Sequence, residues 1–323
     1  MLSALKARFP GISDNLAERL SRLADIDKLL SKQSVIDAIN GLPAGKRERF
    51  FESMTKDNSF VKPPDNLLKN HIGQIDEQIV EVWRKLDATG NDNKKVDFEF
   101  LKENKGRTQE QIRNALDNAN IRLEQAARLE ATRPAVAEFL RESANSALYR
   151  GRLLSSISEM FGSGGSKLDE FIEFYRNDGA LHSRLSALRG KPAAEVRQEL
   201  ETIFKGADFN AHHIVPANLL YNNEVLQDIL EWAAKNGKSF DFNDIDNLVF
   251  LRLGNHTDGA YGHNIYDRLI DKEILGLENV FKNSPSEAFN QLQSKIKKYQ
   301  NGIKDQLIGT QKKLDNLNAS QLK

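Results

Sequence analysis

The chain has 323 residues, enough for two or three domains, and 39% of them are apolar and 28% charged, as in a helix-rich globular protein. Its 46 basic and 46 acidic side chains cancel, so net charge gives no indication of a nucleic-acid partner. The absence of cysteine excludes disulfides, thiolate metal sites and thiol nucleophiles. We expect no membrane association, because no apolar run approaches the roughly 20 residues of a span, and the first residues lack a signal peptide's apolar core.

Turn signals divide the beginning of the chain into short helices. Residues 15–30 carry apolar side chains at helical spacing, and residues 31–54 predict two helices divided at Gly41-Leu42-Pro43. Clusters of Pro, Gly, Asn and Asp predict loops at 62–66 and 88–95. This part of the chain therefore predicts helices and no strand.

The longest helical stretch covers residues 108–161. Thr108 and Gln111 have the spacing of a capping box, and Pro134 suits the first turn of a second helix. The glycines before Lys167 lack the full spacing of a phosphate-binding loop and follow no predicted strand, so they indicate a turn between helices. Nothing in these helices indicates chemistry.

Four of the chain's six histidines fall within 52 residues. His212 and His213 end a short extended run, and residues 248–251 form a second apolar run that is entered through Asn247. Between the two runs, residues 222–238 predict an amphipathic helix. The two runs predict a small hairpin of strands.

A loop and a helix follow the second strand and carry the other two histidines. His256 lies in the loop, and His263 opens a predicted helix over residues 263–277. His263 shares the inward apolar stripe that we assign to Ile265, Tyr266, Leu269, Ile270 and Ile274. If this helix packs on the hairpin, both histidines converge on the end of the first strand. Four imidazoles would then meet at one place.

Adjacent imidazoles suit phosphodiester hydrolysis, which needs a base for water and a cation for the charge of the phosphorane. Neighbouring residues of a strand point to opposite faces, so one imidazole can face a metal while the other faces the substrate. Asn247, at the mouth of the paired strand, could bond the base imidazole or the loop that carries it. A structural zinc site and unrelated packing histidines are the alternatives.

These motifs resemble a known family. Ala211-His212-His213, the later IDNLVFL and the final GHNIY are similar to the AHH nucleases, a branch of the HNH/endonuclease VII superfamily with a ββα-metal core. The resemblance covers residues 205–275. Members of the family occur as toxin modules at the C-termini of bacterial polymorphic toxins.

The resemblance implies a role for each site residue. His212 and His263 would be metal ligands, His213 the general base, and Asn247 the asparagine that orients the base. Family members usually have the last two histidines closer together than the seven positions that separate His256 from His263 here. His256 is therefore one candidate for a further ligand and the carboxylate of Asp258 is the other.

We expect three regions in the chain. Residues 1–105 would form a helical delivery or linker region, 106–203 a second helical region, and 204–323 a nuclease domain with a basic C-terminal helix. The expected fold class is mainly α, with a small α+β core of the ββα-metal type after the helical N-terminal region. Residues 45–59 and 78–92 are also similar to tail segments of polymorphic-toxin proteins, although Phe50, Phe51 and Trp83 suit ordinary core positions as well.

Charge is uneven around the expected site. Residues 201–263 carry four basic and nine acidic side chains, a net of −5, whereas residues 282–323 carry eight and three, a net of +5. Contacts to a polyanionic backbone are therefore expected from the C-terminal helix, at Lys295, Lys297 and Lys298. The alternative is that these lysines only solvate a helix that packs through its apolar face.

The combined expectation is a one-metal endonuclease that hydrolyses DNA and acts as an interbacterial toxin. RNA is the alternative substrate, and a non-enzymatic helical interaction module with a structural metal is the alternative of another class. The expected cofactor is one divalent ion, Mg²⁺ first, with Zn²⁺ and Mn²⁺ as alternatives. The resemblance also implies a cognate immunity protein and a secretion-system carrier or chaperone. The chain would be made in the bacterial cytoplasm and delivered into the target-cell cytoplasm without a signal peptide.

Overall fold

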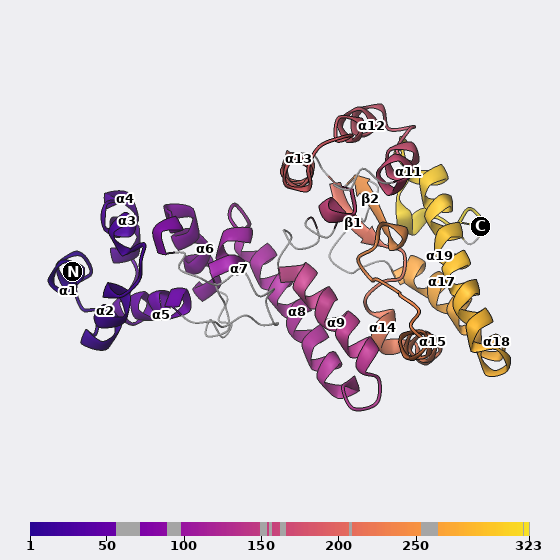
Figure 1. Cartoon of the computed structure of the whole chain (residues 1–323), viewed down its shortest axis with the longest axis horizontal. Helices are drawn as coiled ribbons and strands as arrows, with labels where there is room; N and C mark the ends of the chain where they lie inside the picture. The colour runs from indigo at the N-terminus through magenta and orange to yellow at the C-terminus, as the bar shows by residue number, and fades with distance from the viewer. Residues whose placement is uncertain are drawn as a thin grey trace. The chain divides into compact units, whose positions relative to one another are not determined.

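Helices dominate the computed structural model (Figure 1), which describes residues 1–55, 72–88, 98–148, 154, 157–161, 166–206, 209–252, 264–318 and 320–322. The chain forms two compact units: unit 1 is Met1–Asn120 with Ala147–Tyr149, and unit 2 is Ile121–Ser146 with Arg150–Lys323. Helices α8 (Gln109–Leu129) and α9 (Pro134–Leu148) contribute residues to both units. Within the described ranges, no helix combines the length and the apolar character needed to cross a membrane.

Unit 1 consists of short helices. Besides the first part of α8, they are α1 (Leu2–Arg8), α2 (Asp14–Ser21), α3 (Ile26–Leu30), α4 (Gln33–Asn40), α5 (Ala44–Thr55), η1 (Ile72–Gln74), α6 (Glu77–Ala88) and α7 (Phe98–Glu103). The predicted break between α4 and α5 at residues 41–43 is confirmed. The helical pattern over residues 15–30 is divided between two helices, because the chain leaves the helix after Ser21 and starts another at Ile26. A continuous helix would turn Ile26 away from the face of Leu16 and Leu20, whereas the break buries all three.

Aromatic side chains form the centre of unit 1. The rings of Phe9 and Phe51 have centroids 4.9 Å apart, Phe50 and Phe51 5.6 Å, and Phe50 and Trp83 5.7 Å, all edge to face. All four side chains are fully buried. The interpretation of Phe50, Phe51 and Trp83 as core residues is confirmed. Aromatic rings in this geometry also attract one another beyond the effect of burial.

Helix α8 begins with the predicted capping box. The amide of Thr108 donates to Oε1 of Gln111 at 3.0 Å, and the amide of Gln111 donates to Oγ1 of Thr108 at 3.2 Å. Pro134 is the first residue of α9, as predicted, and its fixed backbone angle suits that position. The sequence signals at both helix starts are therefore confirmed.

Unit 2 contains the two strands of the described chain. Its further elements are α11 (Ser166–Phe174), α12 (Gly179–Ser186), α13 (Ala193–Gly206), β1 (Phe209–His213), α14 (Leu219–Asn222), α15 (Glu224–Lys235), η3 (Ile245–Asn247), β2 (Leu248–Arg252), α17 (Asn264–Leu275), α18 (Glu278–Asn283), α19 (Pro285–Leu307) and η4 (Leu314–Asn316). The fold is mainly α with a small α+β core, as the sequence predicts.

The strands β1 and β2 form an antiparallel hairpin that helices cover on both faces (Figure 1). His213 pairs with Leu248 and His212 with Val249. On the face of His213, the ring of Phe250 packs against Phe171 of α11 at 5.1 Å. On the face of His212, Tyr266 of α17 covers the strand. Adjacent residues of β1 therefore meet different helices, as the pleat of a strand requires.

Helix α17 presents a narrower apolar stripe than predicted. Tyr266, Ile270 and Ile274 are buried and Leu269 is partly buried, but Ile265 is 52% exposed. The assignment of Ile265 to the inward stripe is wrong. Successive helical residues lie about 100° apart, so Ile265 falls beside the stripe when Tyr266 points inward.

The C-terminal segment packs against α19 at Gly302. A β-carbon at this position would lie 2.5 Å from the carbonyl oxygen and 2.7 Å from the Cα of Leu322, whose side chain is fully buried. Gly302→Ala is therefore expected to lower the free energy of unfolding by about 1–3 kcal/mol through overpacking, measured by urea denaturation. Gly179→Ala is the matched control, because Gly179 opens α12 and a β-carbon there would meet no heavy atom within 4 Å. Equal stability changes in the two variants would contradict the close contact.

Candidate functional site

His213 stands at the end of β1 with its ring held on two sides. The imidazole stacks on Phe242, with centroids 4.1 Å apart and planes at 16°, and its Nε2 lies 3.1 Å from Oδ1 of Asn243. With a carbonyl oxygen as partner, Nε2 carries the proton and Nδ1 keeps its lone pair. Both partners come from the segment between α15 and η3, so this segment sets the orientation of the ring.

The charge state of His213 follows from its surroundings. Burial lowers the pKa of His213 to about 4, the bond to Asn243 opposes this shift, and the positive charge of Arg122 adds to it. The imidazole is therefore neutral near pH 7. A neutral imidazole is the form that can take a proton from water.

Asn247 holds the backbone around His213 and not its ring. Oδ1 of Asn247 accepts from the amide of Val215 at 2.9 Å, and Nδ2 donates to the carbonyl of Phe242 at 2.9 Å. The backbone carbonyl of Asn247 accepts from the amide of Ile214 at 2.8 Å. The sequence predicts that Asn247 bonds either the base imidazole or the loop that carries it, and the structure shows the second. Its side chain joins the exit of β1 to Phe242, the residue on which His213 stacks.

His212 points to the opposite face of the hairpin. Its ring is buried, with 4% exposed, and meets the ring of Tyr266 edge to face at 4.9 Å. The hydroxyl of Tyr266 donates to the carbonyl of Ile214 at 2.8 Å. The start of α17 is therefore fixed next to His212, and the residue before α17 is His263.

Three of the sequence candidates lie outside the described residues, namely His256, Asp258 and His263. Within the described ranges, no group of three or more His, Asp or Glu side chains is close enough to hold a metal ion. The imidazole of His212 is a suitable ligand type for a divalent ion. The metal role of all four residues stays a prediction.

A comparison with family models bears on this site. The model named AHH, described as a nuclease family of the HNH/ENDO VII superfamily with conserved AHH, matches residues 196–306. This part of the chain is therefore similar to the AHH nuclease family. The matched AHH segment contains Ala211, His212 and His213 and extends from α13 to the end of α19. No curated protein and no solved structure matches the chain.

Nucleases of the HNH/ENDO VII superfamily generally use a divalent metal. The AHH segment covers the two strands and the helix that follows them, which is where His212 meets α17. Helices α9, α11 and α12 precede the AHH segment, yet they belong to the same unit 2 or contribute residues to it. The family match and the compact unit therefore have different boundaries.

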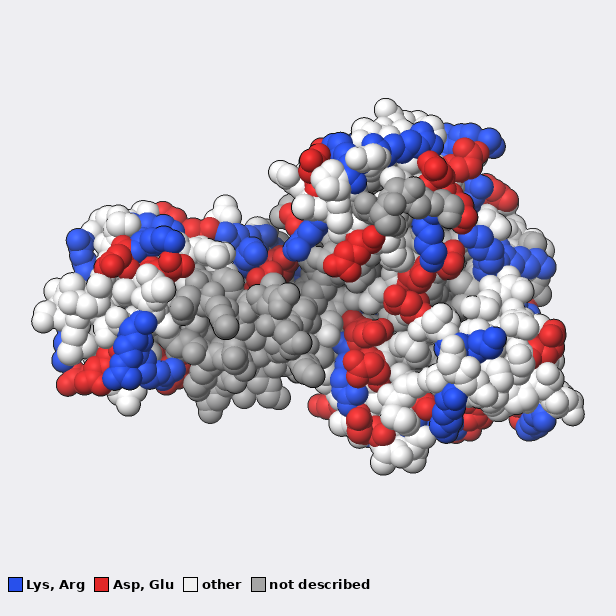
Figure 2. Space-filling model, in the orientation of Figure 1, with Lys and Arg blue, Asp and Glu red and all other residues white. Residues whose placement is uncertain are grey.

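The three lysines predicted to bind a polyanion do not share one surface. Lys295 pairs with Glu273 of α17 at 2.6 Å, and Lys297 lies 3.5 Å from Asp246, while Lys298 is exposed. Lys295 and Lys297 point about 200° apart around α19. On the described face shown in Figure 2, basic and acidic side chains are interspersed. A nucleic-acid contact by these lysines stays a prediction, and Lys298 has the most suitable exposure.

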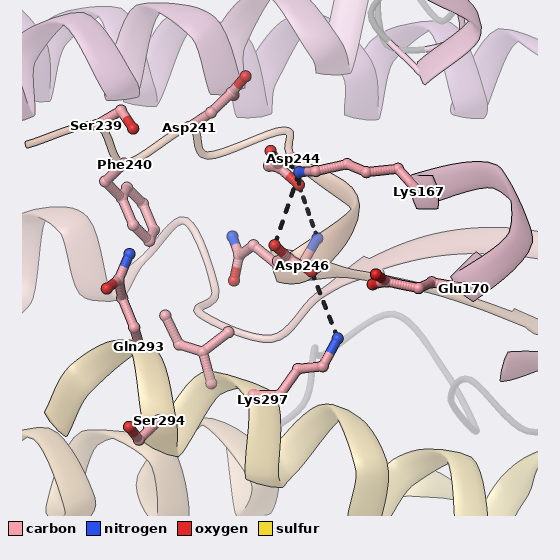
Figure 3. A pocket seen from close by; sticks show the side chains of 12 residues that line it. Lys167, Glu170, Ser239, Phe240, Asp241, Asp244, Asp246, Gln293, Ser294 and Lys297 are labelled. Atoms are coloured by element: carbon pink, nitrogen blue, oxygen red, sulfur yellow. Dashed lines mark hydrogen bonds and ion pairs between the residues drawn. The ribbon is translucent and has the colours of Figure 1, made fainter. Parts of the chain in front are cut away.

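A cavity of about 590 Å³ lies between α11, the segment 239–247 and α19 (Figure 3). Lys167 binds both carboxylate oxygens of Asp244 at 2.8 Å, and Lys297 approaches Asp246 from the other side. The charged lining is Lys167, Lys297, Glu170, Asp241, Asp244 and Asp246, two ammonium groups against four carboxylates. Such a cavity does not suit a polyanion, and its ion pairs instead hold the segment that carries Asn243.

Two residues at His213 were missed from the sequence. Asn243 lies 30 positions from His213 and Arg122 lies 91 positions before it, so neither is part of a local motif. The only sequence signal for Asn243 is its place in the Asp- and Asn-rich turn before Asn247. Arg122 is one of several arginines on a predicted helix and carries no signal at all.

Proposed function

We propose that the AHH segment is the catalytic part of a metal-dependent endonuclease that hydrolyses DNA. The observation that carries this proposal is the placement of two adjacent imidazoles on opposite faces of one hairpin within a segment of a nuclease family. One imidazole is held by a ring and an amide oxygen, while the other meets the helix that follows His263. Two neighbouring residues can in this way perform two different tasks.

His213 is the general base of the proposed reaction. Its Nδ1 takes a proton from water while the water oxygen forms a bond to phosphorus, the bond from phosphorus to the leaving oxygen breaks, and that oxygen takes a proton from solvent. Asn243 keeps the opposite nitrogen protonated, which leaves Nδ1 as the basic atom. Asn247 keeps the exit of β1 and the stacking residue Phe242 in fixed relative positions.

His212 is proposed as a metal ligand together with His263 and with either His256 or Asp258. The ion expected first is Mg²⁺, with Zn²⁺ and Mn²⁺ as alternatives. A divalent ion bound there would stabilise the negative charge that develops on the phosphate during the reaction. The buried position of His212 suits a ligand, because burial fixes the direction of its imidazole.

DNA is the proposed substrate and RNA the alternative. The site chemistry acts on any phosphodiester, and the resemblance to toxin nucleases favours DNA. The role proposed is an interbacterial toxin, made in the cytoplasm and delivered into the cytoplasm of a target cell. This role requires a cognate immunity protein and a secretion-system carrier or chaperone, and unit 1 is the candidate for a delivery segment.

Incubation of the purified chain with plasmid and with total RNA tests the proposal. We expect plasmid to be nicked and linearised in the presence of Mg²⁺, Mn²⁺ or Zn²⁺ and to stay intact in chelator. Degradation of RNA with intact plasmid would shift the assignment to a ribonuclease. A chain that binds one metal tightly and leaves both nucleic acids intact would instead be an interaction module with a structural metal.

A further inference from the structure

Helices α8 and α9 form a helical hairpin that precedes the AHH segment, and α9 reaches the neighbourhood of His213. In unit 2, the hydroxyl of Ser146 on α9 lies 3.4 Å from Oδ1 of Asn243, the atom that bonds His213. The rings of Phe139 and Phe240 meet edge to face at 5.5 Å. One face of α9 therefore lies against the segment that orients the imidazole.

Polar contacts with α15 fix this hairpin in place. The amide of Val136, in the first turn of α9, donates to Oε1 of Glu231 at 3.0 Å. Arg133 forms an ion pair with Asp228, one turn earlier on α15. A carboxylate at a helix N-terminus satisfies amides that have no partner within the helix. The position of α8 and α9 relative to His213 is thus set by residues of the AHH segment.

Arg122 on α8 is a partly buried cation next to α9. Its Nη1 donates to the carbonyl of Ser143 at 2.8 Å. Within the described part of the chain, no carboxylate lies within 4.0 Å of its guanidinium, whereas Arg133 and Arg252 each have one. Burial lowers the pKa of Arg122. The carbonyl that it binds belongs to Ser143, one turn before Ser146, whose hydroxyl lies 3.4 Å from the Asn243 oxygen that bonds His213. A guanidinium removed from water without a counter-ion is costly, which indicates an anion that binds there.

Glu142, which directly precedes Ser143 on α9, does not supply that counter-ion. Burial raises the pKa of Glu142 to about 7, and Asp241 and Glu138 add to this shift. Its Oε2 is buried without a hydrogen-bond partner. Glu142 is therefore largely uncharged below pH 7 and leaves the positive charge of Arg122 available.

We propose that Arg122 binds the substrate phosphate next to His213, so that a residue outside the AHH segment completes the site. This inference rests on the proposed nuclease function. A guanidinium offers two parallel N–H groups to two phosphate oxygens, and a fixed cation beside the phosphorane stabilises the charge that develops there. The base and the cation would then approach one phosphate from neighbouring elements of unit 2.

The test compares Arg122→Gln and Arg122→Lys with Arg128→Gln, which removes the same charge from an exposed position of α8. The probe is a fluorescent duplex DNA, with binding measured in chelator over a range of salt and cleavage measured with Mg²⁺ under single-turnover conditions. We expect Arg122→Gln to cleave about 10²-fold more slowly and to lower the salt slope of binding by about one. Arg122→Lys should keep the slope and recover part of the rate. Arg128→Gln should stay within a few-fold of the parent.

Three results would overturn the inference. The first is an Arg122→Gln protein with the parent's rate and salt slope while His213→Ala is inactive, which leaves the nuclease proposal intact. The second is a loss of rate in Arg122→Gln with an unchanged slope and a lowered melting temperature, which assigns Arg122 to packing. The third is a parent that cleaves no duplex with any divalent ion, which rejects the nuclease proposal and this inference together.

Discussion

Replacement of His213 with alanine is expected to slow plasmid cleavage by about 10²–10⁴-fold, the usual contribution of a positioned general base. Metal affinity should stay at the parent value, because the ring of His213 lies on the opposite face of the hairpin from His212. His212→Ala should lower both metal affinity and cleavage. Cleavage rates under single-turnover conditions and titration calorimetry of the metal check the two expectations.

His182→Ala is the matched control for these variants. His182 lies partly buried on α12 in unit 2 and outside the AHH segment. Its replacement removes an imidazole without touching the hairpin and should leave cleavage and metal affinity within a few-fold of the parent. A His213→Ala protein that cleaves as fast as His182→Ala would show that another group takes the proton.

The second large effect concerns the boundary of the nuclease. The segment 204–323 contains every residue proposed for chemistry in the AHH segment, but its apolar core is shared with earlier helices. The core around Phe250 includes side chains of three earlier helices, namely Val136 and Leu140 of α9, Phe171 and Tyr175 of α11, and Leu200 of α13. We therefore expect 204–323 expressed alone to be unfolded and inactive, whereas 121–323, the compact unit, should fold and cleave.

The magnitude of this effect follows from burial. Each large apolar side chain contributes about 1.5–3 kcal/mol when fully buried, and the whole stability of a domain is about 5–15 kcal/mol. Loss of the five partners just named is enough to remove that stability. Circular dichroism and thermal unfolding of both fragments provide the measurement. A folded, active 204–323 fragment would show that α9, α11 and α13 are dispensable.

Structural features that depend on periodic or local sequence signals were predictable. The two strands, the break at residues 41–43 and the capping box of Thr108 and Gln111 each depend on residues close together in the chain. The histidine pair was predictable as a candidate site because its alternation follows from the pleat of a strand alone. The structure places the pair as that pattern requires.

Contacts between distant elements were not predictable. Asn243 meets His213 only because Asn247 ties the segment 239–247 to the exit of β1. Lys295 looked like a free basic residue on α19, but it pairs with Glu273, a contact that depends on how α17 and α19 pack. Neighbouring lysines in the sequence therefore have different partners in the structure, since different sides of one helix meet different neighbours.

Expression of the intact chain inside bacteria, followed by electrophoresis of the chromosome, tests whether the chain is a toxin whose activity depends on His213. We expect the parent chain to stop growth and degrade the chromosome, and the His213→Ala chain, folded and present at the same level, to do neither. Intact chromosomal DNA and ribosomal RNA in cells that contain the folded parent chain would contradict this expectation.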